Sequence, residues 1–250
     1  GPQTISGIFV RGASPAQSLV MVNGMRISDT NSGSTNWAAV DPSTIERIEI
    51  IRGPASSLYG SSAMGGVINI ITKSDGQDRP FSAFGNFGVG SDSTFKTGFG
   101  FSGAHNNWNY SLAASYASSD GFNATNPDAG PYVYNADDDG YIQTSLSGSL
   151  GYEWNPGQRF DLTFLNGYNH GDFDSGEYYQ NTYDITRQQA YTLGSTNQIT
   201  DNWESILAFG YSKSNHDLQT SNDASGRTEI GTIQRQYSWQ NNLTLDQNNT

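Results

Sequence analysis

The sequence predicts a mostly β fold in two parts, a small α/β unit followed by a series of long antiparallel strands. Three observations lead to this prediction. Residues 5–73 contain aliphatic runs such as LVMV and IEII, separated by glycine and short polar turns. Beyond about residue 80, apolar and aromatic residues recur at every second position. Hydrophobic residues make up only 34% of the 250 residues and charged residues 14%, a composition that suits strands with one polar face.

The first unit is expected to consist of short strands and one short helix. The dipeptide Asn23-Gly24 predicts a tight turn between two of the strands. Ser43, with Glu46 three residues later, resembles a capping box and predicts a helix over 43–47. The strand-forming runs are SLVMVNG (18–24), IERIEIIRG (45–53) and GVINIITK (66–73).

The second part is expected to form about eight antiparallel strands in an up-and-down order, because period two is sustained over segments of ten or more residues. Each strand would have one apolar and one polar face. The predicted strands lie near 81–90, 93–104, 107–118, 141–154, 158–171, 187–200, 202–215 and 230–246.

The connections favour a membrane barrel over a soluble β-sandwich, the alternative fold for such alternation. Short links at 104–107, 155–158 and 200–202 alternate with long polar segments. Outer-membrane barrels have short periplasmic turns, long extracellular loops and aromatic residues at the borders of the apolar band. Tryptophan stands beside each short link, at Trp108, Trp154 and Trp203. The long polar segments are 118–140, 171–186 and 215–229.

Composition excludes several kinds of site. The chain has no cysteine, which excludes disulfides, thiolate zinc sites and a cysteine nucleophile. Its net charge of -12 argues against nucleic acid as a partner. His105, His170 and His216 lack metal-ligand spacing and are expected in a turn and two loops, exposed to solvent.

Several motifs together resemble the plug domain of TonB-dependent outer-membrane receptors. They are FVRG (9–12), VMVNGMRI (20–27) and IERIEIIRGPASSLYGSSAMGGVINIITK (45–73), in the family's order and spacing. The resemblance implies a plug domain at 1–75 and, at 80–250, about eight strands of a barrel of about 22. Within the family, the spacing is most similar to that of the receptors for vitamin B12 (cobalamin).

The resemblance also implies a function. Such a receptor lies in the outer membrane of a Gram-negative bacterium, in contact with its lipid, and actively imports a scarce, large substrate. Cobalamin is the first choice, with a ferric siderophore or haem as alternatives. Energy would come through TonB as partner, by way of an N-terminal box that this sequence does not contain. A passive porin would have no plug, and an outer-membrane hydrolase would need a nucleophile–base pair that the sequence does not suggest. We therefore expect no enzyme activity.

The family's functional positions carry over to named residues. Substrate contacts would fall on Ile5, Ser6, Asn31 and Ser32, the last two at the apex of the loop SDTNSGST (28–35). An ordinary polar turn is the alternative for that loop.

Calcium ligands would fall on Asp137, Asp139, Asp174 and Asp184, with Asn123 as a departure from a fifth acidic position. Glu177 could replace Asp174. Oxygen ligands at converging loop ends suit calcium, and the alternative is a set of separate, solvated carboxylates.

Arginines in the plug motifs are expected to form ion pairs, because an unpaired buried charge is costly. The arginines are Arg11 and Arg52, and the candidate partners within the chain are Glu46 and Glu49. Solvated surface arginines are the alternative.

Overall fold

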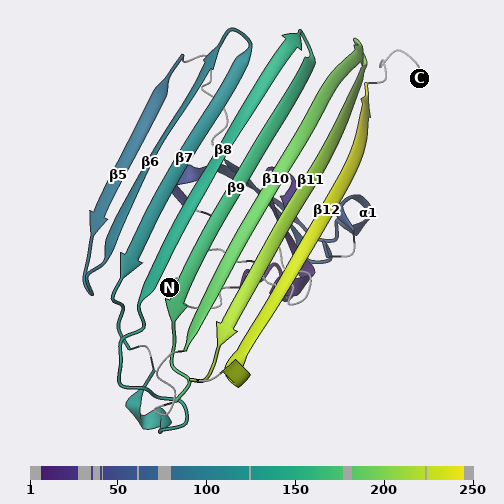
Figure 1. Ribbon diagram of the computed structural model, residues 1–250. Helices are drawn as coiled ribbons and strands as arrows, with labels where there is room; N and C mark the ends of the chain where they lie inside the picture. The colour runs from purple at the N-terminus through teal and green to yellow at the C-terminus, as the bar shows by residue number, and fades with distance from the viewer. Residues whose placement is uncertain are drawn as a thin grey trace.

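The computed structural model describes residues 7–27, 35, 40, 42–60, 62–72, 80–123, 125–176, 182–222 and 224–244. These residues form a four-stranded sheet and an eight-stranded sheet, and the smaller one lies against one face of the larger (Figure 1). The predicted mostly β fold class is confirmed. The predicted boundary between the domains at 1–75 and 80–250 falls within residues 73–79, outside the described residues.

The small sheet has the strand order β2-β1-β4-β3. The central strands β1 and β4 run parallel, and the outer pairs are antiparallel. All five residues of β1 are buried, as expected for a parallel central strand that is covered on both faces. The elements of this part are η1 (Pro15–Gln17), β1 (Ser18–Val22), β2 (Met25–Arg26), η3 (Pro42–Thr44), β3 (Ile45–Arg52), α1 (Ser56–Tyr59) and β4 (Gly66–Thr72).

The two faces of β1 belong to different cores. Leu19 and Met21 pack in a cluster with Ala55 and Ala63, which lie beside α1. Side chains of the opposite parity, Val20 and Val22, belong to a second cluster that reaches across to the large sheet. The continuous apolar run LVMV is therefore explained by burial on both sides.

The Asn23-Gly24 turn is confirmed, whereas the predicted helix over 43–47 is wrong. Asn23 and Gly24 have φ angles of 49° and 78°, and they join Val22 to its cross-strand partner Met25. Only a 3-10 turn, η3, forms before β3 begins at Ile45. Ladder pairing of β3 with β4 outweighs the local capping pattern, because it binds the backbone of almost the whole IERIEIIR run.

The run of small residues at 60–66 lets separate segments of the plug approach one another closely. Ala63 is completely buried. A Cβ at Gly65 would lie 2.6 Å from Cβ of Ala13, and one at Gly66, where φ is 155°, would collide with the carbonyl oxygen of Ile51. These close approaches are internal to the plug.

The large sheet is an antiparallel meander in which every strand pairs with its neighbours in sequence. The predicted up-and-down order is confirmed, and β5 and β12 form the two edges of the sheet. Its strands are β5 (Ser82–Val89), β6 (Phe95–His105), β7 (Trp108–Ser119), β8 (Tyr141–Asn155), β9 (Gln158–Asp172), β10 (Tyr183–Thr200), β11 (Trp203–Gln219) and β12 (Arg227–Leu243). Two short 3-10 helices, η4 (Pro127–Ala129) and η5 (Ala224–Gly226), lie in its long connections.

The last three strands extend further toward the long connections than predicted. β10 begins at Tyr183 rather than near 187, and β11 ends at Gln219 rather than near 215. Residues such as Thr186, His216 and Asp217 are polar, so their alternation carries no apolar signal, yet their backbones continue the ladder.

The two faces of the large sheet differ as the alternation predicts. One face exposes large apolar side chains, among them Phe87 (69% exposed), Leu193 (53%) and Trp239 (70%). The opposite face carries buried side chains such as Leu165, Gln188 and Ser212, where the small sheet packs. The exposed face has the apolar, aromatic character of a surface that contacts lipid.

On the exposed face, two indole groups form hydrogen bonds with side chains of the neighbouring strand. Nε1 of Trp203 donates to Oδ1 of Asn241, and Nε1 of Trp239 donates to Oγ of Ser205, each at 3.0 Å. Internal partners are what a lipid-facing polar group needs, because hydrocarbon offers no acceptor.

None of the helices in the described ranges is long and apolar enough to span a membrane.

The β1–β2 hairpin makes the contact between the small sheet and the wall. Met25, which is 1% exposed, joins a buried cluster with Leu165 of β9 and Ala190 of β10. Its sulfur occupies the place where a Cβ at Gly210 of β11 would stand. Nε2 of Gln236 donates to the carbonyl oxygen of Gly24 at 3.1 Å. A wall glycine, rather than a plug glycine, therefore permits the close approach.

Candidate functional site

Acidic residues gather where the β7–β8 and β9–β10 connections meet, at the lower end of the sheet in Figure 1. The N–H of Asp172 donates to the carbonyl oxygen of Gly140 at 2.9 Å, which joins the two strand ends. Gly176 has a φ of 105°, and a Cβ there would lie 2.9 Å from the backbone of Tyr132. The two connections therefore pack backbone against backbone.

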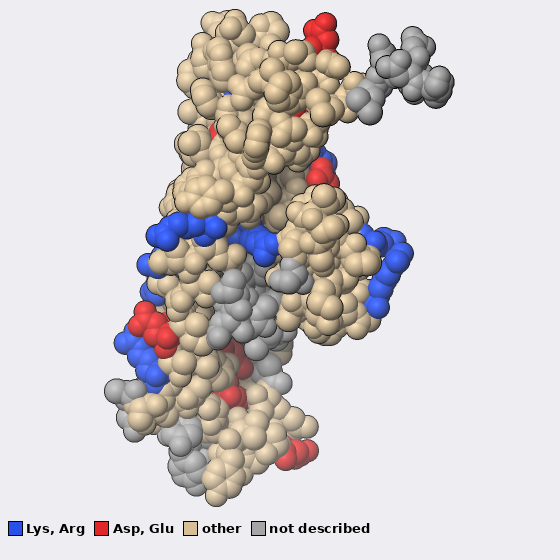
Figure 2. Space-filling view, turned by 90° about the vertical axis from the view of Figure 1, so that its right-hand side faces the viewer, with Lys and Arg blue, Asp and Glu red and all other residues tan. Residues whose placement is uncertain are grey.

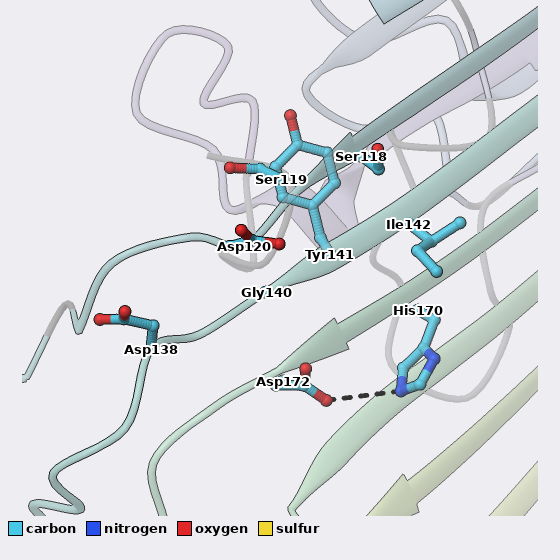
Figure 3. A pocket seen from close by; sticks show the side chains of 9 residues that line it. All are labelled: Ser118, Ser119, Asp120, Asp138, Gly140, Tyr141, Ile142, His170 and Asp172. Carbon is cyan, nitrogen blue, oxygen red and sulfur yellow. Dashed lines mark ion pairs between the residues drawn. The ribbon is translucent and has the colours of Figure 1, made fainter. Parts of the chain in front are cut away.

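A pocket of about 360 Å³ opens at these strand ends. Three carboxylates line it, from Asp120, Asp138 and Asp172, and they lie on its left side in Figure 3. Nε2 of His170 lies 3.5 Å from Oδ1 of Asp172, and the two side chains share one face of β9. The remaining lining residues are Ser118, Ser119, Gly140, Tyr141 and Ile142.

Asp137 and Asp174 form the electrostatic centre of the cluster. Both carboxylate oxygens of Asp174 are buried, and no described residue forms a hydrogen bond with them. Partial desolvation raises the pKa of Asp137, and the charge of Asp174 raises it further, followed by Asp172 and Asp138. Asp137 remains mostly exposed, but its environment still disfavours the ionised form.

The structure does not bring the four predicted calcium ligands together. Asp184 lies on the inner face of β10, where Nε2 of His216 lies 2.6 Å from its Oδ1. Asp139 is only 8% exposed. Across the described part of the chain, no group of three acidic or histidine residues is arranged to hold a metal ion. The strand ladder fixes Asp184 opposite β11, whereas Asp137 and Asp174 lie in the connections.

Asn123 has a structural role. Its Nδ2 donates to the carbonyl oxygen of Asn135, and its Oδ1 accepts the N–H of Thr125 at 2.9 Å. Asn123, the departure from the fifth acidic position, therefore stabilises the fold of the β7–β8 connection.

Sequence reasoning missed the association of His170 with Asp172. The available signal was their spacing, because residues two apart share a face of a strand. The prediction of solvated loop histidines is wrong for His170 and His216, which lie on β9 and β11 beside carboxylates, because these strands run past the apolar positions.

The predicted plug ion pairs form with a different arginine. Arg47 contacts Glu46 at 3.1 Å and Glu49 at 2.9 Å. Arg11 and Arg52 are exposed and form no ion pair with any described residue. Arg47 lies between Glu46 and Glu49 on β3, which explains why it forms an ion pair with each of them.

The predicted substrate contacts Ile5, Ser6, Asn31 and Ser32 lie outside the described residues, as does Glu177.

Comparison with known proteins agrees with this architecture. Residues 1–67 match the family described as TonB-dependent Receptor Plug Domain. The siderophore receptor PirA from Acinetobacter baumannii superposes with a TM-score of 0.76 at 21% identity, over 95% of this chain and 39% of that one. The sequence and fold of the present chain are those of a TonB-dependent receptor. The large sheet is accordingly a set of outer-membrane barrel strands.

The relatives of this TonB-dependent receptor chain include transporters and receptors with different named substrates. The vitamin B12 transporter BtuB of Photobacterium profundum is 29% identical over 98% of this chain and 40% of its own length. The ferric enterobactin receptor of Pseudomonas aeruginosa is 42% identical over 32% of this chain and 12% of its own length. The chain spans about two fifths of the length of the first of these curated relatives.

Proposed function

We propose that this chain belongs to a receptor that imports a scarce, large substrate across the outer membrane, with energy delivered through TonB. The observation that carries the proposal is a small mixed sheet held against the inner face of barrel strands. A porin has no reason to carry such a sheet, because it would obstruct the passage. Curated relatives are named as transporters and receptors, in keeping with import rather than catalysis.

The plug contact suits a part that must yield under force. In the described part of the chain, the β1–β2 hairpin reaches the wall through Met25 and Gly24. The contact at Gly210 is a shape fit with one hydrogen bond from Gln236 beside it. Such a contact is local, so force on the plug could release it without disturbing the strand ladder.

Cobalamin is the substrate that we propose first, and a ferric siderophore second, with haem third. The similarity to vitamin B12 transporters covers nearly the whole chain, whereas the similarity to the enterobactin receptor covers a third of it. The test is equilibrium binding of cyanocobalamin and of a ferric catecholate to the intact receptor. Saturable, submicromolar binding of cyanocobalamin alone would support the first choice. Binding of the catecholate alone would replace it, and binding of neither would contradict the proposal.

We also propose that calcium binds between Asp137 and Asp174. The supporting observation is the pair of buried Asp174 oxygens with no described hydrogen-bond partner, next to a second carboxylate. A hard cation that prefers oxygen ligands would balance this charge and tie the two connections together. Asp184 is not part of this proposed site, because its carboxylate lies beside His216.

The calcium proposal is tested by calorimetry on the intact receptor. Asp174→Asn should weaken calcium binding at least tenfold. Asp128→Asn should leave binding unchanged, because Asp128 is an exposed carboxylate of the same connection. Equal calcium affinity in wild type and Asp174→Asn would show that no site exists there.

A further inference from the structure

Three basic side chains lie on the outer face of neighbouring strands in the large sheet. Arg187 of β10, Lys213 of β11 and Arg235 of β12 have the same parity as the exposed residues Tyr191, Phe209 and Tyr237. The register pairs Lys213 with Ile233, two positions from Arg235, and pairs Asn215, two positions from Lys213, with Arg187. The three cations therefore follow a diagonal across adjacent strands.

The direction of this diagonal follows the tilt of the strands. The strands lean in Figure 1, so a level row must step along each successive strand, as these residues do. Figure 2 shows Lys and Arg side chains on the outer surface of the sheet, at the left of the view, where they extend over the middle part of its height. In a tilted barrel, a row that steps in this direction stays closer to one depth than residues paired in register would.

The row lies at the outer border of the apolar band. Trp203 marks the opposite border, beside a short turn at residues 201–202. From Trp203 to Lys213 the strand rises roughly 33 Å at ~3.3 Å per residue. A tilt of ~40° reduces this to a height of about 25 Å, which equals the height of an outer-membrane apolar band. Because the long connections lie beyond this border, it faces the outer leaflet.

Within the described residues, no ion pairs balance the charges of the row. No described residue forms an ion pair with Arg187, Lys213 or Arg235. Arg187 lies over the ring of Tyr168, 5.4 Å from its centroid, which holds it against the outer face.

Acidic groups on the same face lie further toward the loops. Asp217 is held by Arg227 at 2.7 Å, and it also lies within the electrostatic reach of Arg187. Glu229 pairs in register with Asp217. Both carboxylates lie on the loop side of the row, and neither forms an ion pair with its three cations.

We propose that Arg187, Lys213 and Arg235 form a binding surface for the phosphate groups of the phosphorylated glycolipid in the outer leaflet. Cations at a membrane border attract anionic headgroups, and each contributes to lipid affinity. Tyr191 and Tyr211, whose rings lie 6.3 Å apart, border the row on its apolar side, where amphipathic rings suit the headgroup level. The surface would orient the receptor in the leaflet and does not take part in substrate binding.

The test uses the intact receptor in detergent with purified lipopolysaccharide, whose binding is measured by retained lipid phosphate and by titration. The combined variant Arg187→Gln, Lys213→Gln, Arg235→Gln should lose about fivefold in affinity for each cation, or roughly 100-fold in all. The matched control is Lys96→Gln, which removes a charge from the opposite parity of β6 and should bind like wild type.

Two further arms keep the proposal falsifiable if the triple variant does not fold. Wild-type receptor should bind enzymatically dephosphorylated lipopolysaccharide far more weakly, and raised salt should weaken binding of the phosphorylated form. Inorganic phosphate at millimolar concentration should not displace the lipid. Full retention of lipid by the triple variant, equal binding of dephosphorylated lipid, or displacement by free phosphate would each overturn the proposal.

Discussion

Met25 links the plug to the wall through a shape fit with Gly210, at the level of single residues. The side chain is 1% exposed and belongs to a cluster shared by both sheets. Met25→Ala should cost about 2–5 kcal/mol of plug stability, because a buried side chain is lost and the wall cannot collapse into the space. Urea unfolding of the plug in the intact receptor, followed by protection of an engineered plug cysteine, measures this. Unchanged protection would mean that the hairpin does not hold the plug.

Asp137 should make the β7–β8 connection sensitive to pH. Its pKa is raised, chiefly by desolvation and then by Asp174, so the ionised form is disfavoured in the folded connection. In the absence of calcium, the free-energy penalty for ionising Asp137 in the folded connection is fully present above the folded pKa of this residue. It diminishes as the pH falls, and it vanishes below the unfolded value of about 3.9. Protection of amides 135–140 from hydrogen exchange should therefore increase on mild acidification.

Asp137→Asn provides the comparison for this pH effect. The variant should be better protected than wild type at neutral pH, and its protection should not change over the acidic window. A variant that keeps the wild-type pH dependence would assign the effect to another carboxylate, such as Asp172.

At the scale of elements, Gly66 controls the pairing of β3 with β4. Its φ of 155° and its contact with the Ile51 carbonyl leave no place for a side chain. Gly66→Ala should destabilise the plug sheet by at least 1–3 kcal/mol. The same change at Gly85 of β5 should be tolerated, because a Cβ there would meet its nearest atom at 3.8 Å. Denaturant unfolding of both variants checks the contrast, and equal loss at both sites would contradict it.

The whole receptor is needed to test the predicted plug apex. Replacing Asn31 or Ser32 by tryptophan should weaken substrate binding in the intact receptor at least tenfold, because a bulky side chain would obstruct the contact surface. Ser57→Trp on α1 serves as the control, since it adds the same bulk to an exposed position away from the loop 28–35. Wild-type affinity in both apex variants would remove these residues from the substrate site.

The sequence by itself determined the architecture of this protein. Alternation from Phe81 onward set the strands, their order and their lipid-facing side, because period two admits one apolar face only. Positive φ at Asn23 and Gly24 followed from the residue types. Plug motifs gave the family, which the match over residues 1–67 supports.

Only the tertiary structure decided how polar groups are paired and where the sheets meet. The sequence cannot show that His216 contacts Asp184 or that Arg47 forms ion pairs with both glutamates. Nor can it show that Asn123 forms a hydrogen bond with Asn135 across its connection. These contacts depend on how the folded chain places the residues. The fit of Met25 to Gly210 has the same origin. Apolar burial leaves a periodic trace along the chain, whereas a hydrogen bond or an ion pair depends on which side chains the fold brings within about 3 Å.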